Sequence, residues 1–101
     1  MDLQTLRAQI AQDRADGAQP FLIVGMAGSV DLGTYDDLEG LADVAEAEDL
    51  WLHVDGAFGA WTRIADDPWR GLSDGIGRAD SIALDFHKWM YVGYDCGLVS
   101  V

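Results

Sequence analysis

Lys88 is the only lysine in this chain of 101 residues, and it lies in the sequence D-F-H-K-W at 85–89, directly after the apolar run at 81–84. Most lysines are surface charges, but the aromatic neighbours of this one favour partial burial of the amine. Burial disfavours the charged form of a lysine, and the neutral amine is the nucleophile that forms a Schiff base with a carbonyl group. On spacing alone, Lys88 is therefore either a surface charge or the covalent anchor of a carbonyl cofactor.

Asp55 is a second candidate, because it ends the strand-like run at 51–54 and precedes two small residues, Gly56 and Ala57. A carboxylate in this position either caps a turn or pairs with a cationic ring nitrogen. Such a pair keeps a pyridine ring protonated, so that the ring can accept electrons from a breaking bond. Ala57 would let a flat ring lie close to the backbone. His53 faces the same way as Asp55 on a strand, either as a packed histidine or as a group that supports the ring.

His87 directly precedes Lys88, where it can touch an anionic group or orient the amine. A competing interpretation joins two His/Asp pairs into a site for zinc or another divalent ion, as in a metal-dependent hydrolase. Its four ligands would be His53, Asp55, Asp85 and His87. We rank this interpretation second, because it leaves Lys88 without a role and lacks a third histidine. A non-catalytic remnant is the third hypothesis.

Alternating helices and strands must position these residues. The first helix is predicted over 2–16, because apolar residues recur on one helical face from Leu3 to Ile10. The second is predicted to begin at a capping box in which Thr34 is the cap and Asp37 stands three positions later. Strands are predicted at 21–24, 51–54, 81–85 and 96–101, with an irregular crossover at 61–79.

This order of elements predicts an α/β fold around a largely parallel sheet. The turn after the first strand, the segment at Asp55 and the segment at Lys88 then lie at the carboxyl ends of strands, where open α/β sheets bind ligands. Two helices do not easily cover both faces of such a sheet. We therefore expect the chain to be a piece of a larger domain.

Composition narrows the partners of the protein. The chain has 18 acidic against 6 Lys and Arg residues and a net charge of -12, which repels nucleic acid and anionic membrane surfaces. The N-terminus has no secretory signal pattern, and no apolar run approaches the ~18 residues of a membrane span. A single cysteine allows no internal disulfide and fits a cytoplasmic location.

Several stretches of the sequence match one known family, in order along the chain. W-L-H-V-D-G-A-F-G at 51–59 resembles the W-L-H-V-D-A-A-Y-G segment of the group II pyridoxal-phosphate-dependent amino-acid decarboxylases, which include the aromatic-L-amino-acid and glutamate decarboxylases. D-S-I-A-L-D-F-H-K-W at 80–89 is similar to their D-S-x-x-x-[ND]-x-H-K-W, and Y-D-C at 94–96 is similar to the segment that follows. The turn at 25–33 resembles their G-T-A-G-T-V-x-x-G.

The resemblance implies a role for each candidate residue. Lys88 would be the Schiff-base lysine of pyridoxal 5'-phosphate, Asp55 would pair with the pyridine nitrogen, and Ala57 would pack against the ring face. His87 would lie near the phosphate, and His53 would support the site. Asp85 stands where some members have asparagine, and an unpaired carboxylate there would repel the phosphate.

The resemblance also implies a setting for this chain. Residues 1–101 would form part of the large domain of the aspartate-aminotransferase-like fold type I, without the upstream phosphate-binding loop and the C-terminal small domain. The full-length enzyme would be a cytoplasmic homodimer that decarboxylates a small-molecule amino-acid substrate. The chain alone is expected to have little or no activity.

Overall fold

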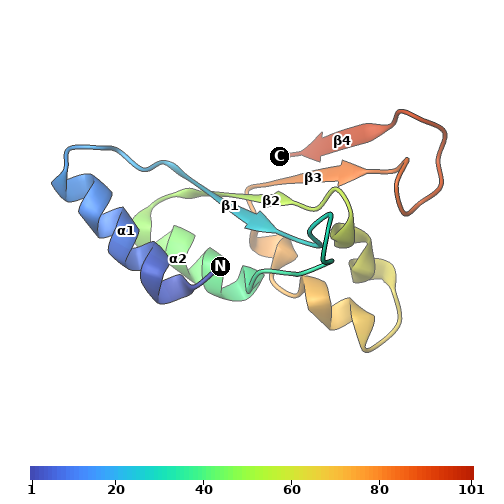
Figure 1. The fold of residues 1–101 in the computed structure, drawn as a ribbon, viewed down its shortest axis with the longest axis horizontal. Helices are drawn as coiled ribbons and strands as arrows, with labels where there is room; N and C mark the ends of the chain where they lie inside the picture. The colour runs from blue at the N-terminus through green and yellow to red at the C-terminus, as the bar shows by residue number, and fades with distance from the viewer.

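Four strands form one mixed sheet in the order β1-β2-β3-β4 (Figure 1). The strands are β1 (Leu22–Met26), β2 (Trp51–Asp55), β3 (Ser81–Asp85) and β4 (Gly97–Ser100). In the computed structural model, which describes residues 1–101, the first three strands are parallel and β4 runs antiparallel to β3. Register places Met26 beside Asp55 and Asp55 beside Ala83, so the carboxyl ends of β1, β2 and β3 lie at one edge. The predicted α/β class with a largely parallel sheet is confirmed.

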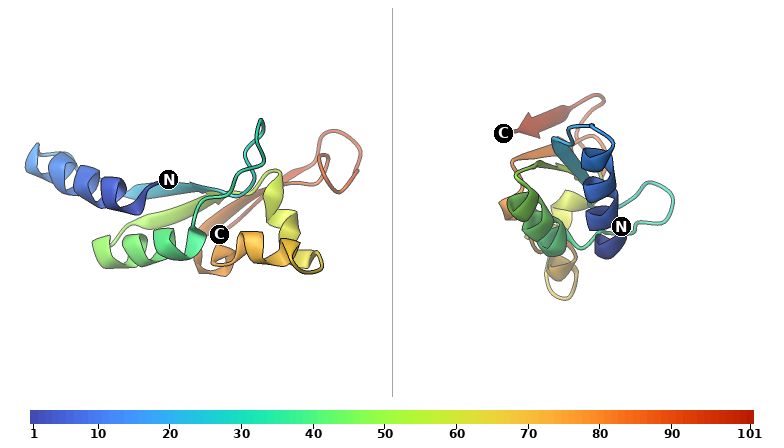
Figure 2. Two further views of the ribbon diagram at one scale, coloured as in Figure 1. Left: turned by 60° about the horizontal axis from the view of Figure 1, so that its bottom comes forward. Right: turned by 90° about the vertical axis from the view of Figure 1, so that its left-hand side faces the viewer.

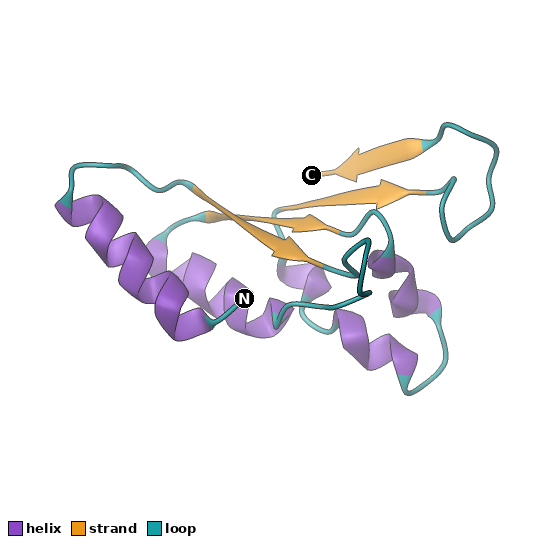
Figure 3. Cartoon of the chain, in the orientation of Figure 1, coloured by secondary structure: helices purple, strands orange, loops and turns teal.

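One face of this sheet carries the helices, as the two views of Figure 2 show. Helix α2 (Leu38–Glu48) packs against β1 and β2, and α1 (Leu3–Ala15) packs beside α2. The colouring of Figure 3 makes the division between sheet and helices plain. The first helix begins as predicted, with the Asp2 carboxylate accepting a hydrogen bond of 2.7 Å from the Thr5 N–H.

The predicted cap of the second helix is wrong. Asp37 is the N-cap of α2, and its carboxylate accepts a hydrogen bond of 3.0 Å from the Gly40 N–H. The hydroxyl of Thr34 lies 2.8 Å from that of Ser29 instead. Tyr35 forms an isolated bridge with Ala27, which keeps this part of the chain extended, so the helix cannot start before Asp37.

The core lies between α2 and the helix-bearing face of the sheet. Alternate residues of β1 and β2, among them Ile23, Leu52 and Val54, are buried against α2. Leu38 and Leu41 are the largest side chains that α2 adds, and both are at most 1% exposed. The opposite face has no such cover, and the side chains of Leu22, Val24 and Trp51 are 40%, 45% and 44% exposed on it.

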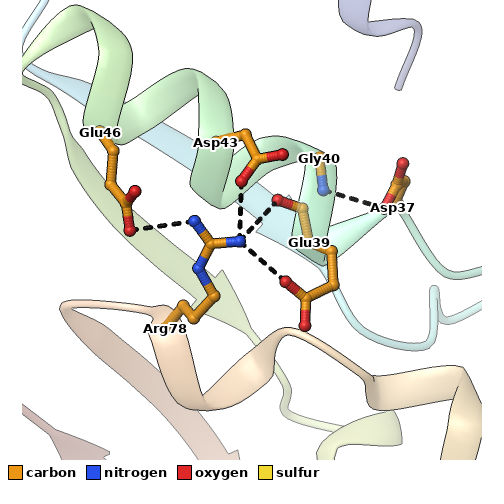
Figure 4. A network of polar contacts seen from close by, with 6 residues as sticks. All are labelled: Asp37, Glu39, Gly40, Asp43, Glu46 and Arg78. Carbon is orange, nitrogen blue, oxygen red and sulfur yellow. Dashed lines mark hydrogen bonds and ion pairs between the residues drawn. The ribbon is translucent and has the colours of Figure 1, made fainter.

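The crossover between β2 and β3 contains three 3-10 helices, in the stretch that the sequence predicts to be irregular. They are η1 (Gly59–Ile64), η2 (Trp69–Ser73) and η3 (Ile76–Arg78). Arg78 fastens η3 to α2, because its guanidinium lies within 3.0 Å of carboxylate oxygens of Glu39, Asp43 and Glu46 (Figure 4). Hydrogen bonds to Glu39 first, then to Glu46 and Asp43, raise the pKa of Arg78 above its usual range.

None of the helices is both long enough and apolar enough to cross a membrane.

Candidate active site

Backbone hydrogen bonds join the segments that follow β1 and β2 to each other and to the neighbouring strands. The Ala27 N–H donates to the Asp55 carbonyl at 2.8 Å, and the Gly56 N–H donates to the Ala83 carbonyl at 3.0 Å. The Gly59 N–H in turn donates to the Ala27 carbonyl at 2.9 Å. The carboxyl ends of β1, β2 and β3 are therefore held together beyond the last residues of the strands.

Two glycines let the first two of these segments approach closely. Gly28 has φ +81°, and a Cβ atom there would lie 2.8 Å from the Gly59 Cα. A Cβ on Gly59 would lie 2.6 Å from the Ala27 carbonyl oxygen. The hydroxyl of Tyr35 donates to the Gly59 carbonyl at 3.1 Å and adds a side-chain bond to this contact. A side chain at either glycine would push the two segments apart.

Lys88 lies in the loop after β3 and reaches back toward the end of β2. Its Nζ is 2.5 Å from Asp85 Oδ2 and 4.1 Å from the centroid of the Phe58 ring. The side chain is 26% exposed, so the predicted partial burial is confirmed. The hydrogen bond from Lys88 lowers the pKa of Asp85.

This ion pair changes the electrostatic effect that Asp85 has on a nearby anion. A free carboxylate near a phosphate would repel it, but the charge of Asp85 is balanced by Lys88. The indole N–H of Trp61 donates to the Asp85 carbonyl at 3.1 Å, and the Trp61 ring packs edge-on against Phe86 at 4.7 Å between centroids. The backbone that carries Lys88 is thus fastened to η1.

Asp55 is half-buried at the end of β2, on the face of the sheet that the helices leave open. Its Oδ1 accepts a hydrogen bond of 3.1 Å from the Ala57 N–H. The second oxygen, Oδ2, makes no hydrogen bond within the protein and is available to a ligand. Asp55 therefore orders the turn and keeps one acceptor oxygen free.

His53 lies on the same face and contacts the neighbouring strand. Its Nδ1 is 2.8 Å from the hydroxyl of Ser81, the residue beside it in the register of β2 and β3. Trp51 donates its indole N–H to the same hydroxyl at 2.8 Å. The two histidines of the chain thus have different partners, because His87 contacts the start of β4 instead.

His87 Nδ1 lies 3.0 Å from both the N–H and the carbonyl oxygen of Cys96, and one ring nitrogen cannot bond both at once. The Cys96 carbonyl already accepts from the Phe86 N–H at 2.9 Å. The Cys96 N–H has no other acceptor in the protein, so we assign Nδ1 as its acceptor, which leaves Nε2 as the donor of the neutral ring. The ring also packs edge-on against Tyr94, with centroids 4.8 Å apart.

The four residues of the hypothetical metal site are not arranged as ligands. No group of three or more His, Cys, Asp and Glu side chains is placed to hold a metal ion. Asp85 bonds Lys88, and His53 bonds Ser81. The geometry gives the hydrolase hypothesis no support.

Sequence reasoning missed three residues that shape this region, namely Phe58, Trp61 and Ser81. Phe58 lies under the Lys88 amine, Trp61 holds the Asp85 backbone, and Ser81 bonds His53. Only the strand register and the path of the crossover bring them to their partners. The alternation of β2 and β3 would have placed Ser81 beside His53 if the register had been known.

An apolar hollow of about 400 Å³ lies close to the same loop. Its walls come from the turn before α2, from η1 and η2, and from the loop after Lys88. They include Tyr35, Trp61, Trp69 and Trp89. Two tryptophans of the crossover, Trp61 and Trp69, thus line an open space.

Comparison with known proteins identifies the family. The model of the pyridoxal-dependent decarboxylase conserved domain matches residues 1–101. The aromatic-L-amino-acid decarboxylase of Bacillus atrophaeus is 41% identical over 101 residues, which are 100% of this chain and 21% of that protein. The human cysteine sulfinic acid decarboxylase is 43% identical over 93 residues, or 92% of this chain and 19% of that protein.

Solved structures agree with these relatives. The glutamate decarboxylase domain of a diaminobutyrate-pyruvate transaminase and L-2,4-diaminobutyrate decarboxylase from Vibrio parahaemolyticus superposes with a TM-score of 0.92 at 43% identity, over 98% of this chain and 21% of that one. Oryza sativa TDC with PLP and tryptamine gives a TM-score of 0.88 at 30% identity, over 100% of this chain and 21% of that one. The chain spans about a fifth of the length of the relatives it matches. It belongs to the pyridoxal-dependent decarboxylase family and has the fold of the corresponding part of those enzymes.

Proposed function

We propose that this chain is the segment of a pyridoxal-phosphate-dependent amino-acid decarboxylase that carries the lysine to which the cofactor is covalently bound, and that this lysine is Lys88. The observation that supports the assignment most strongly is the position of its amine. Lys88 is the only lysine of the chain, and its Nζ lies over the ring of Phe58, three residues after Asp55.

The side chains around this amine fit the cofactor. A primary amine can bond an aldehyde carbon, and a carboxylate with one free oxygen can bond a protonated pyridine nitrogen. Asp55 has that free oxygen, since only its Oδ1 is bonded within the protein. Ala57 is half-buried next to Asp55, where a small side chain leaves space for a ring face. When bound, pyridoxal phosphate would supply an electron sink for the bond between the substrate Cα and its carboxylate.

Each of the four candidate side chains then has a defined task. Asp55 would hold a proton at the ring nitrogen, and Lys88 would bind the cofactor once its ion pair with Asp85 is broken. His87 offers its Nε2–H to an anionic group, because its Nδ1 is bonded to the Cys96 N–H. His53 lies beside Asp55 on the open face of β2, where it would support the bound ring.

The chain is part of a larger catalytic unit in this proposal. Residues 1–101 form part of the cofactor-binding large domain, and the whole enzyme is a homodimer that acts on an α-amino acid. The relatives include an aromatic-L-amino-acid decarboxylase and a cysteine sulfinic acid decarboxylase. Both names describe the loss of a carboxylate from an amino acid.

The test is covalent labelling of Lys88. The full 101-residue chain is incubated with pyridoxal phosphate, reduced with borohydride and digested, and the modified peptide is identified by mass spectrometry. We expect the label on the peptide that contains Lys88. We expect none at that position in Lys88→Ala or in Lys88→Arg, which keeps a cation beside Asp85 but has no nucleophilic amine.

The chain has one other amine, the N-terminus of Met1, which pairs with Asp36. Labelling of Met1 alone in the unmodified chain, with Lys88 unmodified, would contradict the assignment. Equal uptake of the cofactor by the unmodified chain and by Lys88→Arg would contradict it as well.

A further inference from the structure

Ser81 connects two side chains of the open face and is itself almost fully buried. It is 7% exposed at the start of β3, and its hydroxyl oxygen lies 2.8 Å from the Trp51 indole nitrogen and 2.8 Å from His53 Nδ1. The indole N–H can only donate. Trp51 therefore occupies one lone pair of the Ser81 oxygen and limits how the hydroxyl can turn.

The single proton of the Ser81 hydroxyl decides the state of His53. If Nδ1 accepts this proton, then the hydroxyl donates once and accepts once, and every group is satisfied. If Nδ1 carried a proton and donated, then the hydroxyl proton would have no acceptor, since the Ser81 hydroxyl has no other hydrogen-bond partner in the protein, side chain or backbone. A buried donor without a partner costs ~1–3 kcal/mol in general. The first arrangement is therefore the stable one.

We infer that Ser81 is a positioning residue that holds His53 as the neutral tautomer with its proton on Nε2, in a chain of hydrogen bonds from Trp51 to Ser81 to His53. Nε2 has no partner within the protein, so its N–H is a free donor on the open face. His53 and Asp55 alternate onto this face, two residues apart.

The consequence for the site rests on the proposed function. A neutral His53 adds a donor beside Asp55 but no positive charge that would compete for its carboxylate. Asp55 Oδ2 then remains free for the cationic ring nitrogen of the cofactor. Ser81 would act through His53 and would not touch the cofactor.

Nitrogen NMR of the uniformly labelled, cofactor-free 101-residue chain tests the inference. The chain has only 2 histidines, so the imidazole spectrum contains two side chains, and the second is an internal reference. At a pH well above ~6.5, long-range proton–nitrogen correlations show which ring nitrogen carries the proton. We expect an unprotonated, hydrogen-bonded Nδ1 and a protonated Nε2 for His53.

Ser81→Ala removes the hydroxyl, and we expect the His53 Nδ1 signal to shift while the His87 signals stay in place. Ser81→Thr keeps a hydroxyl on a residue that suits a strand, and we expect it to restore the original signal. Trp51→Phe alters a half-exposed position and should shift the His53 signal in the same direction as Ser81→Ala.

A protonated Nδ1 on His53 in the unmodified chain would overturn the inference, whether or not any variant folds. So would unchanged His53 signals in both Ser81→Ala and Trp51→Phe. Because the NMR sample contains no cofactor, the inference about His53 can be overturned while the labelling of Lys88 succeeds. The reverse also holds.

Discussion

The amine of Lys88 forms an ion pair with the carboxylate of Asp85. The two side chains are only 26% and 24% exposed, and the amine also rests on the Phe58 ring. Charge pairing therefore restricts the amine to one position.

The pH dependence of stability should report this pair. Lys88 lowers the pKa of Asp85, so the folded state favours ionised Asp85 more than the unfolded state does. The contribution is complete above the usual aspartate pKa of ~3.9 and is lost as the pH falls below it. We expect Asp85→Asn to lower the free energy of unfolding at neutral pH, and we expect the difference to shrink below pH ~3.9.

Urea unfolding at several pH values measures the effect. Asp31→Asn is the matched control, because it changes the net charge by the same amount. Asp31 is exposed and makes no hydrogen bond. An Asp85→Asn difference that is the same at neutral and acidic pH would rule out the pair as its cause.

At this scale the sequence predicted the candidate residues but not their partners. Residue types and neighbours were enough to single out Lys88, Asp55 and His87. The bonds to Asp85 and to Ser81 depend on loop path and strand register, which no local pattern encodes. The sequence therefore suggested a neutral Lys88 amine, whereas the structure pairs that amine with a carboxylate.

The contact between β1 and α2 depends on a residue without a side chain. A Cβ atom on Gly25 would lie 2.8 Å from Leu41 Cδ1 and 3.2 Å from Leu38 Cδ2, and both leucines are fully buried. The glycine lets the helix pack closely just before the turn of the candidate site. The position of that turn therefore follows from the packing of α2.

Gly25→Ala should overpack this contact. We expect a loss of ~1–3 kcal/mol in the free energy of unfolding, the usual cost of an extra methyl group in a tight core. Gly77→Ala is the control, because a Cβ on Gly77 meets no atom within 4 Å. Chemical denaturation of both variants gives the comparison, and equal midpoints would show that the core relaxes around the added methyl group.

The elements were predictable where pattern and length agree. The parallel strands and the first helix follow apolar runs and an apolar stripe, so the sequence locates them within one or two residues. The start of α2 was misplaced, because Thr34 and Asp37 both suit a cap and only the bridge between Tyr35 and Ala27 distinguishes them. The antiparallel direction of β4 depends on the loop at 86–96, which has no regular pattern.

The whole molecule is a sheet with cover on one side. The helices and the sheet together form a core of 13 buried hydrophobic residues. The face that carries His53 and Asp55 stays open. The chain also spans only about a fifth of its relatives. Both facts indicate that cofactor and substrate would need further protein around this face for full enclosure.

We therefore expect the 101-residue chain to release carbon dioxide from amino acids at a rate far below that of a complete decarboxylase, even where Lys88 is labelled. Exclusion of water and orientation of the substrate supply much of the catalytic power of such sites, and an open face provides neither. Release of labelled carbon dioxide from a panel of carboxyl-labelled amino acids measures the rate, with Lys88→Arg as the blank. Turnover comparable to that of a complete enzyme would refute this expectation.

The uncovered face has a consequence for the colloidal behaviour of the chain. Apolar side chains on that face and the unpaired edge of β4 both favour self-association, and such edges are templates for added strands. The opposing force is the mutual repulsion between molecules that each carry a net charge of -12. Added salt screens that repulsion but leaves the apolar surface unchanged, so dilute buffers of low ionic strength are the conditions in which single chains persist.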